Sequence, residues 1–331
     1  MHCISYSKFG PASEVLKPTE VSTPEPKDGE VLVKIHFSGV NPSDAKARAG
    51  NRPGVTKPQY RLVIPNSDGS GIISSVGKGI DAERIGEKVW IWNGQWQRPY
   101  GTAAEFIALP SEQAVQIPGG MSLETGACLG IPGLTAAHCT LGDGSLAGKK
   151  ILISGGSGSV GNIAIQLAKW SGAQVIATGS VSGFDHIYRA GADHVFDYSD
   201  PELSQKIMEI SPLGLDRAIE VEFGQNIDFL HKVMKPYGTI SIYGSAKNMV
   251  PSIPFGQYLY KAINLDIVLI YILPEPQRKL AIQNLYRAHK EGALETKIET
   301  IYNLQDCSLA QDLTLKPGRQ GAVLLRTFCN P

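Results

Sequence analysis

Residues 151–161 read ILISGGSGSVG, an apolar run that enters a turn of glycines and serines. Residues 156–161 fit the pattern G-x-G-x-x-G, which is informative where it follows a strand and opens a helix. Gly156 suits a tight turn, Gly158 lets the backbone approach a pyrophosphate, and Gly161 lets the helix pack closely on the strand. A helix that begins here offers N–H groups and the positive end of its dipole to an anion. We therefore predict a dinucleotide-binding turn.

Strands and helices alternate on both sides of this turn. Strands are expected at 149–154, 174–178, 194–197, 216–221, 238–244 and 265–272. Helices are expected at 160–171, 184–190, 226–235 and 276–290, and a further one has Asp200 as its N-cap and Pro201 at its first position. Runs of Ile and Val that alternate with helices indicate a parallel sheet covered on both faces.

The segment before this alternation has a different character. It is rich in Gly and Pro and contains short β-like runs, such as 30–40, 72–77 and 87–92. The end of the chain returns to mixed character with a β-like run at 322–328. We predict an α/β protein in which a doubly wound parallel sheet of the Rossmann type is inserted in a mainly β domain. We expect residues 123–272 to form the Rossmann domain, and residues 1–122 and 273–331 to form the mainly β domain.

Composition excludes several classes of partner. The chain has 331 residues, with 31 Lys and Arg against 31 Asp and Glu, so its formal net charge is zero. Nucleic acids and acidic membranes attract proteins with a basic field, so neither is expected. No apolar run is long enough to span a bilayer, and residues 1–11 do not resemble a signal peptide. The five scattered cysteines suit reduced thiols, and we expect a cytoplasmic protein.

The loop after the second Rossmann strand bears on the type of dinucleotide. An NAD site usually has Asp or Glu here to bind the ribose 2′-hydroxyl. Residues 178–183 read TGSVSG, and the first acid is Asp185. A 2′-phosphate would not be repelled, so we favour NADPH over NADH. The loop also has no Lys or Arg. The 2′-phosphate would therefore be bound by neutral hydrogen-bond donors and by Arg189.

Several local sequences resemble one family. They are GVNPSDAKARAG (39–50), IPNSDGSGIISSVG (64–77), RPYGTAAEF (98–106) and GACLGIPGLTAA (126–137). They are similar to the zinc-independent NADPH:quinone oxidoreductases (zeta-crystallin-like) of the medium-chain dehydrogenase/reductases, over essentially the whole chain. The resemblance implies that the mainly β domain is GroES-like and catalytic. Zinc-dependent relatives bind a catalytic zinc ion through three side chains. At the corresponding positions this chain has Asn41, Ser67 and Ile131, so no metal is expected.

The resemblance also implies a set of cofactor contacts. Asn41 and Thr135 are expected near the nicotinamide, and Arg319 is a further candidate contact. The pyrophosphate is expected at Ser157, Gly158, Ser159 and Val160, and the adenosine ribose with its 2′-phosphate at Gly179, Ser180 and Tyr198. The nicotinamide ribose is expected beside Asn226, Tyr243, Gly244 and Ser245, with Val268, Leu269 and Ile270 behind it.

Some of these residues have structural alternatives. Asn226 also fits the N-cap of a helix, and Val268–Ile270 also fits the sheet core or a dimer edge. Lys46 stands about where many relatives have a tyrosine, and it is either a catalytic proton donor or a solvated surface lysine. Gly183 stands where relatives often have a basic residue, which weakens the preference for NADPH.

Aromatic residues gather at VWIWNGQWQRPYG (89–101). They are candidates for a wall on which a flat acceptor stacks, although Trp90 and Trp92 also fit a strand that faces the core. Trp96 is the better candidate for a pocket, because it is expected in a loop.

Three functions remain open from the sequence. The first is transfer of a hydride from NADPH to a quinone without a metal ion. The second is reduction of an activated C=C bond, as in an enoyl or alkenal reductase. The third is an NADPH-binding structural protein with little turnover. The resemblance implies a homodimer, and the apolar residues 265–272 could pair across its two-fold axis.

Overall fold

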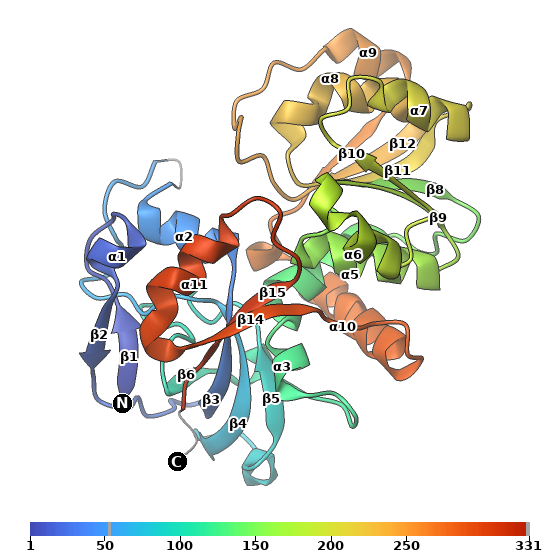
Figure 1. Cartoon of the computed structure of the whole chain (residues 1–331). Coiled ribbons are helices and arrows are strands. Elements are labelled where there is room, and N and C mark those ends of the chain that lie inside the picture. The colour runs from blue at the N-terminus through green and yellow to red at the C-terminus, as the bar shows by residue number, and fades with distance from the viewer. Residues whose placement is uncertain (52–53, 329–331) are drawn as a thin grey trace. The chain divides into compact units, whose positions relative to one another are not determined.

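The structure is a computed structural model, and it describes residues 1–51 and 54–328 (Figure 1). The chain forms two compact units. The first unit contains residues 1–131 and 296–331, and the second contains residues 132–295. Residues 123–272 were expected to form the second domain, whereas in the structure the second unit begins at residue 132 and the chain returns to the first unit at residue 296.

The second unit is built on a parallel sheet of six strands. These are β8 (Lys150–Ile153), β9 (Gln174–Gly179), β10 (His194–Asp197), β11 (Leu215–Glu220), β12 (Met234–Ile242) and β13 (Asn264–Ile267). Their order across the sheet is β10–β9–β8–β11–β12–β13, and every neighbouring pair is parallel. The chain therefore winds outward in two directions from the β8–β11 pair. This order is that of the Rossmann fold, so the predicted fold class is confirmed.

Helices cover both faces of this sheet. They are α4 (Leu134–Leu141), α5 (Ser159–Trp170), α6 (Phe184–Arg189), α7 (Leu203–Ile210), α8 (Phe223–Val233), α9 (Phe255–Tyr260) and α10 (Glu275–Lys290). Figure 1 shows α7, α8 and α9 on one face and α5, α6 and α10 on the other. Because both faces are covered, the Ile and Leu side chains of β8 are buried, which explains the uninterrupted apolar run ILI at 151–153.

Several elements differ from the sequence prediction. The strand expected at 265–272 is the short β13, and residues Ile270–Ile272 form a 3₁₀ turn instead. Helix α7 begins at Leu203, because Asp200 accepts the N–H of Glu202 and closes a turn before the helix. Helix α8 begins at Phe223, three residues earlier than expected.

Helix α10 belongs to the second unit because it packs against α4 and α5. A side-chain amide secures the segment that follows this helix. Gln166 of α5 donates to the carbonyl oxygen of Glu295 at 2.9 Å and accepts the N–H of Glu295 at 2.8 Å. The residue that ends the second unit is thereby bound to the helix that follows the glycine turn.

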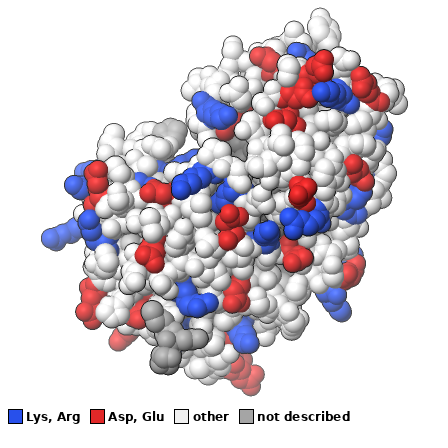
Figure 2. Space-filling view, in the orientation of Figure 1, with Lys and Arg blue, Asp and Glu red and all other residues white. Residues whose placement is uncertain are grey.

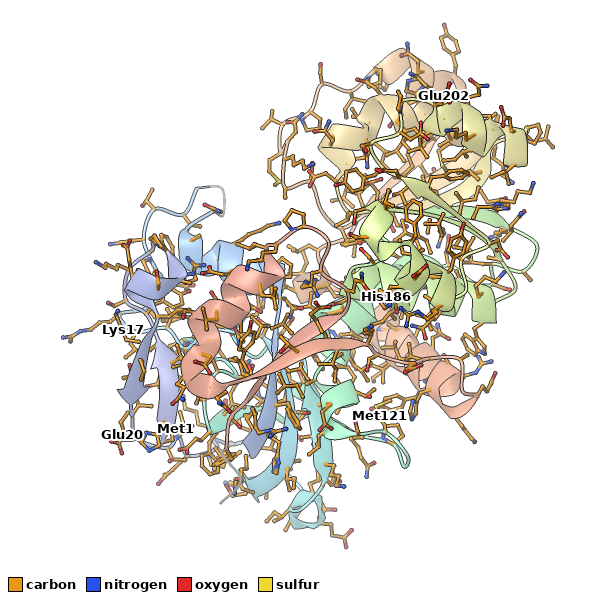
Figure 3. All side chains as sticks on the ribbon, viewed as in Figure 1. Met1, Lys17, Glu20, Met121, His186 and Glu202 are labelled. Atoms are coloured by element: carbon orange, nitrogen blue, oxygen red, sulfur yellow. The ribbon has the colours of Figure 1, made fainter. Side chains whose placement is uncertain are left out.

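The first unit is mainly β, as predicted. Its large sheet contains β3 (Glu30–Val40), β4 (Asp68–Val76), β5 (Lys88–Ile91), β6 (Phe106–Pro110), β7 (Ala114–Gln116), β14 (Ile298–Asn303) and β15 (Ala322–Arg326). A smaller antiparallel pair joins β1 (His2–Ser5) to β2 (Lys17–Glu20). Figure 3 labels Lys17 and Glu20 at the two ends of β2 and Met1 just before β1. The helices are α1 (Ala12–Val15), α2 (Pro42–Ala49), α3 (Leu123–Gly126) and α11 (Cys307–Thr314).

The charged side chains are mixed in sign over the surface that is shown, and the described cysteines are buried. Basic and acidic side chains are interspersed over the face shown in Figure 2. Cys3, Cys128, Cys139 and Cys307 are all free and buried. Burial raises the pKa of Cys3 to about 11 and of both Cys128 and Cys139 to about 12, and it also raises the pKa of Cys307. Cys329 lies outside the described residues.

Candidate functional site

The glycine turn joins β8 to α5, as the motif predicts. Gly155 takes the left-handed conformation, with a φ of +71°, so the tight turn depends on this glycine more than on Gly156. A Cβ at Gly161 would lie 2.3 Å from the carbonyl oxygen of Gly155. The first turn of α5 therefore packs directly on the chain that leaves β8, and this contact requires glycine.

The open side of the turn is at Gly158. A Cβ there would have Gly155 O as its nearest neighbour, at 3.5 Å, so the space beyond is free. Gly158 precedes α5, and no side chain caps the helix. Backbone N–H groups at the start of α5 and the positive end of its dipole thus face an open cradle. Ser157, Gly158, Ser159 and Val160 form this cradle together, and its shape and donors fit a pyrophosphate.

The loop after β9 packs against the glycine turn. A Cβ at Gly183 would lie 2.9 Å from the Cβ of Ser157, so this position has no room for a basic side chain. Ser180 Oγ and Ser182 Oγ are 3.1 Å apart. The N–H of Tyr198 donates to the carbonyl oxygen of Gly179 at 3.2 Å. Gly179, Ser180 and Tyr198 thus lie at one place, where β9 and β10 end.

Asp197 is an acid at this place that the sequence analysis missed. It ends β10 and is paired in register with Gly179 on β9. One carboxylate oxygen of Asp197 accepts the N–H of Ser199 at 2.8 Å and its hydroxyl at 2.7 Å. The Ser199 hydroxyl and N–H lower the pKa of Asp197, so it is ionised at neutral pH. Only the register between β9 and β10 reveals this acid, because it lies 18 residues beyond Gly179 in the sequence.

Glu220, at the end of β11, is a second acid that the sequence analysis missed. Its side chain is fully buried, and it accepts hydrogen bonds from Ser154 Oγ at 2.6 Å, the Glu222 N–H at 2.6 Å and Asn226 Nδ2 at 3.0 Å. Burial raises the pKa of Glu220, although these three hydrogen bonds act in the opposite direction. Asn226 is not an N-cap, because α8 begins at Phe223. Its amide is instead oriented by Glu220.

The residues after β12 lie beside this acid. Tyr243 donates its N–H to the carbonyl oxygen of Glu220 at 3.0 Å, and a Cβ at Gly244 would lie 2.4 Å from the carbonyl oxygen of Val221. Ser245 Oγ accepts the N–H of Gly224 at 2.8 Å. Burial raises the pKa of the Tyr243 hydroxyl well above its usual range. The predicted residues Tyr243, Gly244 and Ser245 therefore form one tight connection.

The predicted residues beyond β13 have mixed environments. Val268 continues the pairing of the strand, because its N–H donates to the carbonyl oxygen of Ile242 at 2.8 Å. Leu269 is half exposed, whereas Ile270 is buried at the start of the 3₁₀ turn. Thr135 is buried in the first turn of α4.

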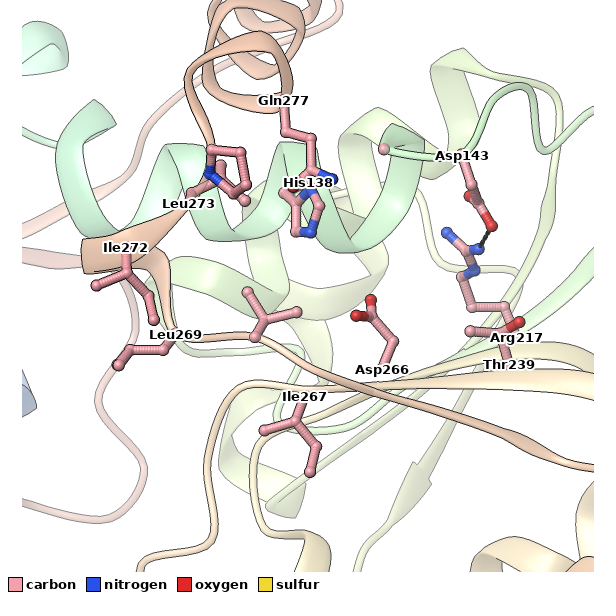
Figure 4. A pocket seen from close by; sticks show the side chains of 13 residues that line it. His138, Asp143, Arg217, Thr239, Asp266, Ile267, Leu269, Ile272, Leu273 and Gln277 are labelled. Atoms are coloured by element: carbon pink, nitrogen blue, oxygen red, sulfur yellow. Dashed lines mark hydrogen bonds and ion pairs between the residues drawn. The ribbon is translucent and has the colours of Figure 1, made fainter.

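A hollow of about 440 Å³ lies in the second unit beside β13 (Figure 4). Val268 and Leu269 line it, together with His138 of α4 and Asp266 of β13, which face each other in Figure 4. Arg217 forms an ion pair with Asp143 at its side. Burial lowers the pKa of His138, while Asp266 acts to raise it. The lining of this hollow is mainly apolar next to Leu269 and polar next to Asp266.

The predicted residues of the first unit are Asn41, Lys46 and Arg319. Asn41 is buried and immediately precedes α2, and Lys46 is half-buried within this helix. Arg319 lies between α11 and β15, and burial lowers the pKa of its guanidinium. The amide of Asn41 donates from Nδ2 to Asp68 Oδ2 at 2.7 Å. Asp68 is a further buried acid that the sequence analysis did not consider.

The three tryptophans considered as an aromatic wall have different environments. Trp90 and Trp92 are buried, so they belong to the core of the first unit. Trp96 is half-buried in the loop between β5 and β6, between the left-handed residues Asn93 and Gln97.

Two kinds of feature are absent from the described residues. Within residues 1–51 and 54–328, no group of three or more His, Cys, Asp or Glu side chains is arranged to hold a metal ion. None of the helices described in these ranges is long and apolar enough to cross a membrane.

Comparisons with known proteins agree with this fold. Residues 27–119 match the alcohol dehydrogenase GroES-like domain, and residues 159–283 match the zinc-binding dehydrogenase domain. The quinone oxidoreductase of Rattus norvegicus is 32% identical over 248 residues, which are 74% of this chain and 73% of that protein. The chloroplast envelope quinone oxidoreductase homolog of Arabidopsis thaliana is 30% identical over 328 residues, 96% of this chain and 94% of that protein.

A solved structure of a mycobacterial protein complexed with NADPH shares the fold. Its TM-score is 0.88 at 24% identity, and the match covers 99% of this chain and 100% of that one. The fold and the relatives define a medium-chain dehydrogenase/reductase. Within that class, the chain belongs to the zinc-independent quinone oxidoreductase family. It is an oxidoreductase that uses a nicotinamide cofactor.

Proposed function

We propose that this protein transfers a hydride from NADPH to a quinone without a metal ion. One observation carries the proposal. Apart from Thr135, the cofactor residues predicted in the second unit lie at or shortly after the carboxyl ends of six parallel strands. The carboxyl ends of parallel strands share one edge of a sheet, where doubly wound folds bind their ligands.

Each part of this edge suits a part of the cofactor. The cradle at 157–160 would hold the pyrophosphate, and Gly179, Ser180 and Tyr198 would surround the adenosine ribose. Asn226 and the 243–245 connection would bind the nicotinamide ribose, with Val268, Leu269 and Ile270 behind it. Bound NADPH supplies the hydride, and the role of the protein is to orient it and to exclude water.

The preference for NADPH rests on the end of β9. The loop at 179–183 has no acid, so a 2′-phosphate there meets the hydroxyls of Ser180 and Ser182. Asp197 lies nearby, but Ser199 occupies one of its carboxylate oxygens. We therefore propose a moderate preference for NADPH, because neutral donors bind a phosphate less strongly than Lys or Arg do.

For Asn41 and Arg319 we propose the cofactor contacts that the family resemblance implies, and for Lys46 a role inferred from its position alone. Reduction of a quinone to a neutral hydroquinone consumes one hydride and one proton. Lys46 would donate a proton or a charge-assisted hydrogen bond to the reduced oxygen. Thr135 would lie beside the nicotinamide.

We also propose a homodimer. Ile267 of β13 is 79% exposed, and Leu269 and Ile272 beside it are also exposed. Strand β13 ends the order of the parallel sheet, so its free edge could pair with the same strand of a second copy. An elution volume on gel filtration that matches a monomer at micromolar concentration would remove this proposal.

The test is oxidation of NADPH and NADH by the purified protein in buffer that contains a metal chelator. Ortho- and para-quinones are offered in parallel with short enals, enones and an enoyl-CoA. Loss of NADPH that depends on quinones alone supports the proposal. A preference for the alkenes would identify a C=C reductase instead. Tight NADPH binding without reduction of either class would indicate a binding protein with little turnover.

A further inference from the structure

Glu220 is a fully buried carboxyl group at the point where the parallel sheet changes direction. It ends β11, and Ser154 follows the neighbouring strand β8. The chain winds outward in both directions from this pair of strands, and doubly wound folds bind their ligands at the carboxyl ends of such a pair. Within residues 1–51 and 54–328, no salt bridge involves Glu220. A buried acid without a cation costs stability, so its presence here calls for an explanation beyond packing.

The two oxygens of Glu220 have different partners. Oε2 accepts the hydroxyl of Ser154 at 2.6 Å, whereas Oε1 accepts both the N–H of Glu222 at 2.6 Å and Nδ2 of Asn226 at 3.0 Å. A backbone N–H can only donate, so the atom that faces Glu222 must be an acceptor. Oε1 therefore accepts in the ionised and in the protonated form of the acid, because a proton would reside on Oε2. The same acceptor is always presented to Asn226.

This acceptor determines which end of the Asn226 amide faces Glu220. An amide has one donating end and one accepting end. Nδ2 must face Oε1 of Glu220, which directs Oδ1 of Asn226 away from it. Among the residues that the structure describes, none donates to Oδ1, and this oxygen is not one of the buried polar atoms that lack a hydrogen bond. Oδ1 is therefore open to solvent and available to a ligand.

The backbone at Asn226 is fixed as well. Asn226 lies in the first turn of α8, and its N–H donates to the carbonyl oxygen of Glu222 at 3.1 Å. The N–H of Phe223, which begins the helix, donates to the carbonyl oxygen of Gly244 at 3.1 Å. The start of α8 is thereby attached to the 243–245 connection. The side-chain torsions of Asn226 are the freedom that remains, and the hydrogen bond to Glu220 restricts them.

We propose that Glu220 is a positioning residue that holds the amide of Asn226 with Oδ1 outward, where it accepts a hydrogen bond from a hydroxyl of the nicotinamide ribose. This inference rests on the proposed function, and every residue in it belongs to the second unit. Glu220 acts through Asn226 and does not itself touch the cofactor.

Two substitutions of Glu220 separate its role as an acceptor from its charge. Glu220→Gln removes the charge but keeps the acceptor, because the N–H of Glu222 excludes an amide nitrogen from the place of Oε1. Glu220→Leu removes the acceptor too, so the amide of Asn226 can rotate. We expect NADPH binding to be at least as tight as in the wild type for Glu220→Gln, and about tenfold weaker for Glu220→Leu.

The experiment is a double-mutant cycle on the full-length protein. It compares the wild type, Glu220→Leu, Asn226→Ala and the double variant, with NADPH affinity measured by fluorescence titration. We expect no further loss when Glu220→Leu is added to Asn226→Ala. The affinity for 2′,5′-ADP is measured by calorimetry, because this fragment has the adenosine half of the cofactor but no nicotinamide ribose. It should be unchanged in all four proteins, whereas a collapse of the sheet edge would weaken it.

Ser154→Ala is the matched control. It breaks the hydrogen bond to the other oxygen of the same carboxyl group and leaves the contact between Glu220 and Asn226 in place. The control should lower thermal stability without changing NADPH affinity. If Ser154→Ala weakens NADPH binding as much as Glu220→Leu does, or if Glu220→Gln is as weak as Glu220→Leu, the orientation of Asn226 is not the cause and the proposal is wrong.

If Glu220→Leu does not fold, NMR of the wild type replaces the cycle. The side-chain amide signals of Asn226 are assigned by their loss in Asn226→Ala. They should be protected from exchange with water before any cofactor is added, and they should shift with NADP⁺ but not with 2′,5′-ADP. Signals that exchange freely in the unliganded protein, or that shift equally with both ligands, overturn the proposal.

Failure of this proposal is distinguishable from failure of the proposed function. If the wild type binds neither NADPH nor NADH, the proposed function fails, and the role of Glu220 fails with it. If the wild type binds NADPH and reduces quinones, but the effects of Glu220→Leu and Asn226→Ala are additive, only the role of Glu220 is rejected. The same conclusion follows if 2′,5′-ADP binding falls as much as NADPH binding.

Discussion

Gly158 and Gly161 lie three residues apart in the glycine turn, and replacing each with alanine should have a different effect. At Gly161 the new Cβ would lie 2.3 Å from Gly155 O, about 1 Å closer than a normal carbon–oxygen contact. The helix and the turn must separate by that amount. Overpacking of this kind costs about 1–3 kcal/mol, and the better helix propensity of alanine returns about 1 kcal/mol. We expect a net loss of about 1 kcal/mol in the free energy of unfolding.

At Gly158 the new Cβ has its nearest neighbour at 3.5 Å, and the φ of −74° is acceptable for alanine. Gly158→Ala should therefore fold with a stability close to that of the wild type. Its methyl group would project into the cradle and displace the pyrophosphate from the N–H groups of α5. A hydrogen bond to a charged group contributes about 1.5–3 kcal/mol, so the loss of one weakens NADPH binding by about 10- to 100-fold.

The assay combines thermal unfolding with titration of NADPH fluorescence. Gly161→Ala should lower Tm by about 2–4 °C and also weaken NADPH binding, because the cradle shifts with the helix. Gly158→Ala should weaken binding alone. If Gly158→Ala binds NADPH as tightly as the wild type, the pyrophosphate does not lie at this turn, and the assignment of the site is wrong.

Three further predictions concern the other parts of the site. Lys46→Ala should lower kcat with the true acceptor by about 100-fold and leave NADPH affinity unchanged, and an unchanged kcat in a steady-state assay would identify Lys46 as a surface lysine. Ser180→Asp should weaken NADPH binding by at least about tenfold more than NADH binding, and equal losses would place the 2′-phosphate elsewhere. The raised pKa of Glu220 means that its ionised form destabilises the fold, so the stability that the protonated form provides is lost as pH rises through that pKa. In urea unfolding, Glu220→Gln should therefore gain stability relative to the wild type as the pH rises from the ordinary pKa of glutamate through the raised pKa of Glu220, and a difference that does not change with pH would contradict this reasoning.

The fold could be predicted because its signals are local. The ILI run, the glycine spacing and the alternation of strands with helices each occupy a short window, and the Rossmann order follows from them. Strand β13 was predicted too long because an apolar run does not show where backbone pairing ends. In the structure, pairing continues through Val268, and the chain then turns to bury Ile270.

The buried acids could not be predicted because their partners are distant in the sequence. Glu220 meets Ser154 across 66 residues, and Asp68 meets Ile131 across 63. Asp197 reaches Gly179 only through the register of two strands. A carboxyl group that organises a site has no sequence signature unless its partners are known. The positions of Lys46 and Arg319 relative to the cofactor remain predictions for the same reason.

The burial of the cysteines has a consequence if the protein reduces quinones, as proposed. Quinones and enones form covalent adducts with thiolates, and the thiolate is the reactive form of cysteine. At a pKa of about 11, roughly one Cys3 in ten thousand is ionised at neutral pH, and for Cys128 and Cys139 the fraction is smaller still. Throughout residues 1–51 and 54–328, each thiol is also shielded from solvent. This part of the chain is thereby protected from alkylation by the kind of molecule that it is proposed to reduce.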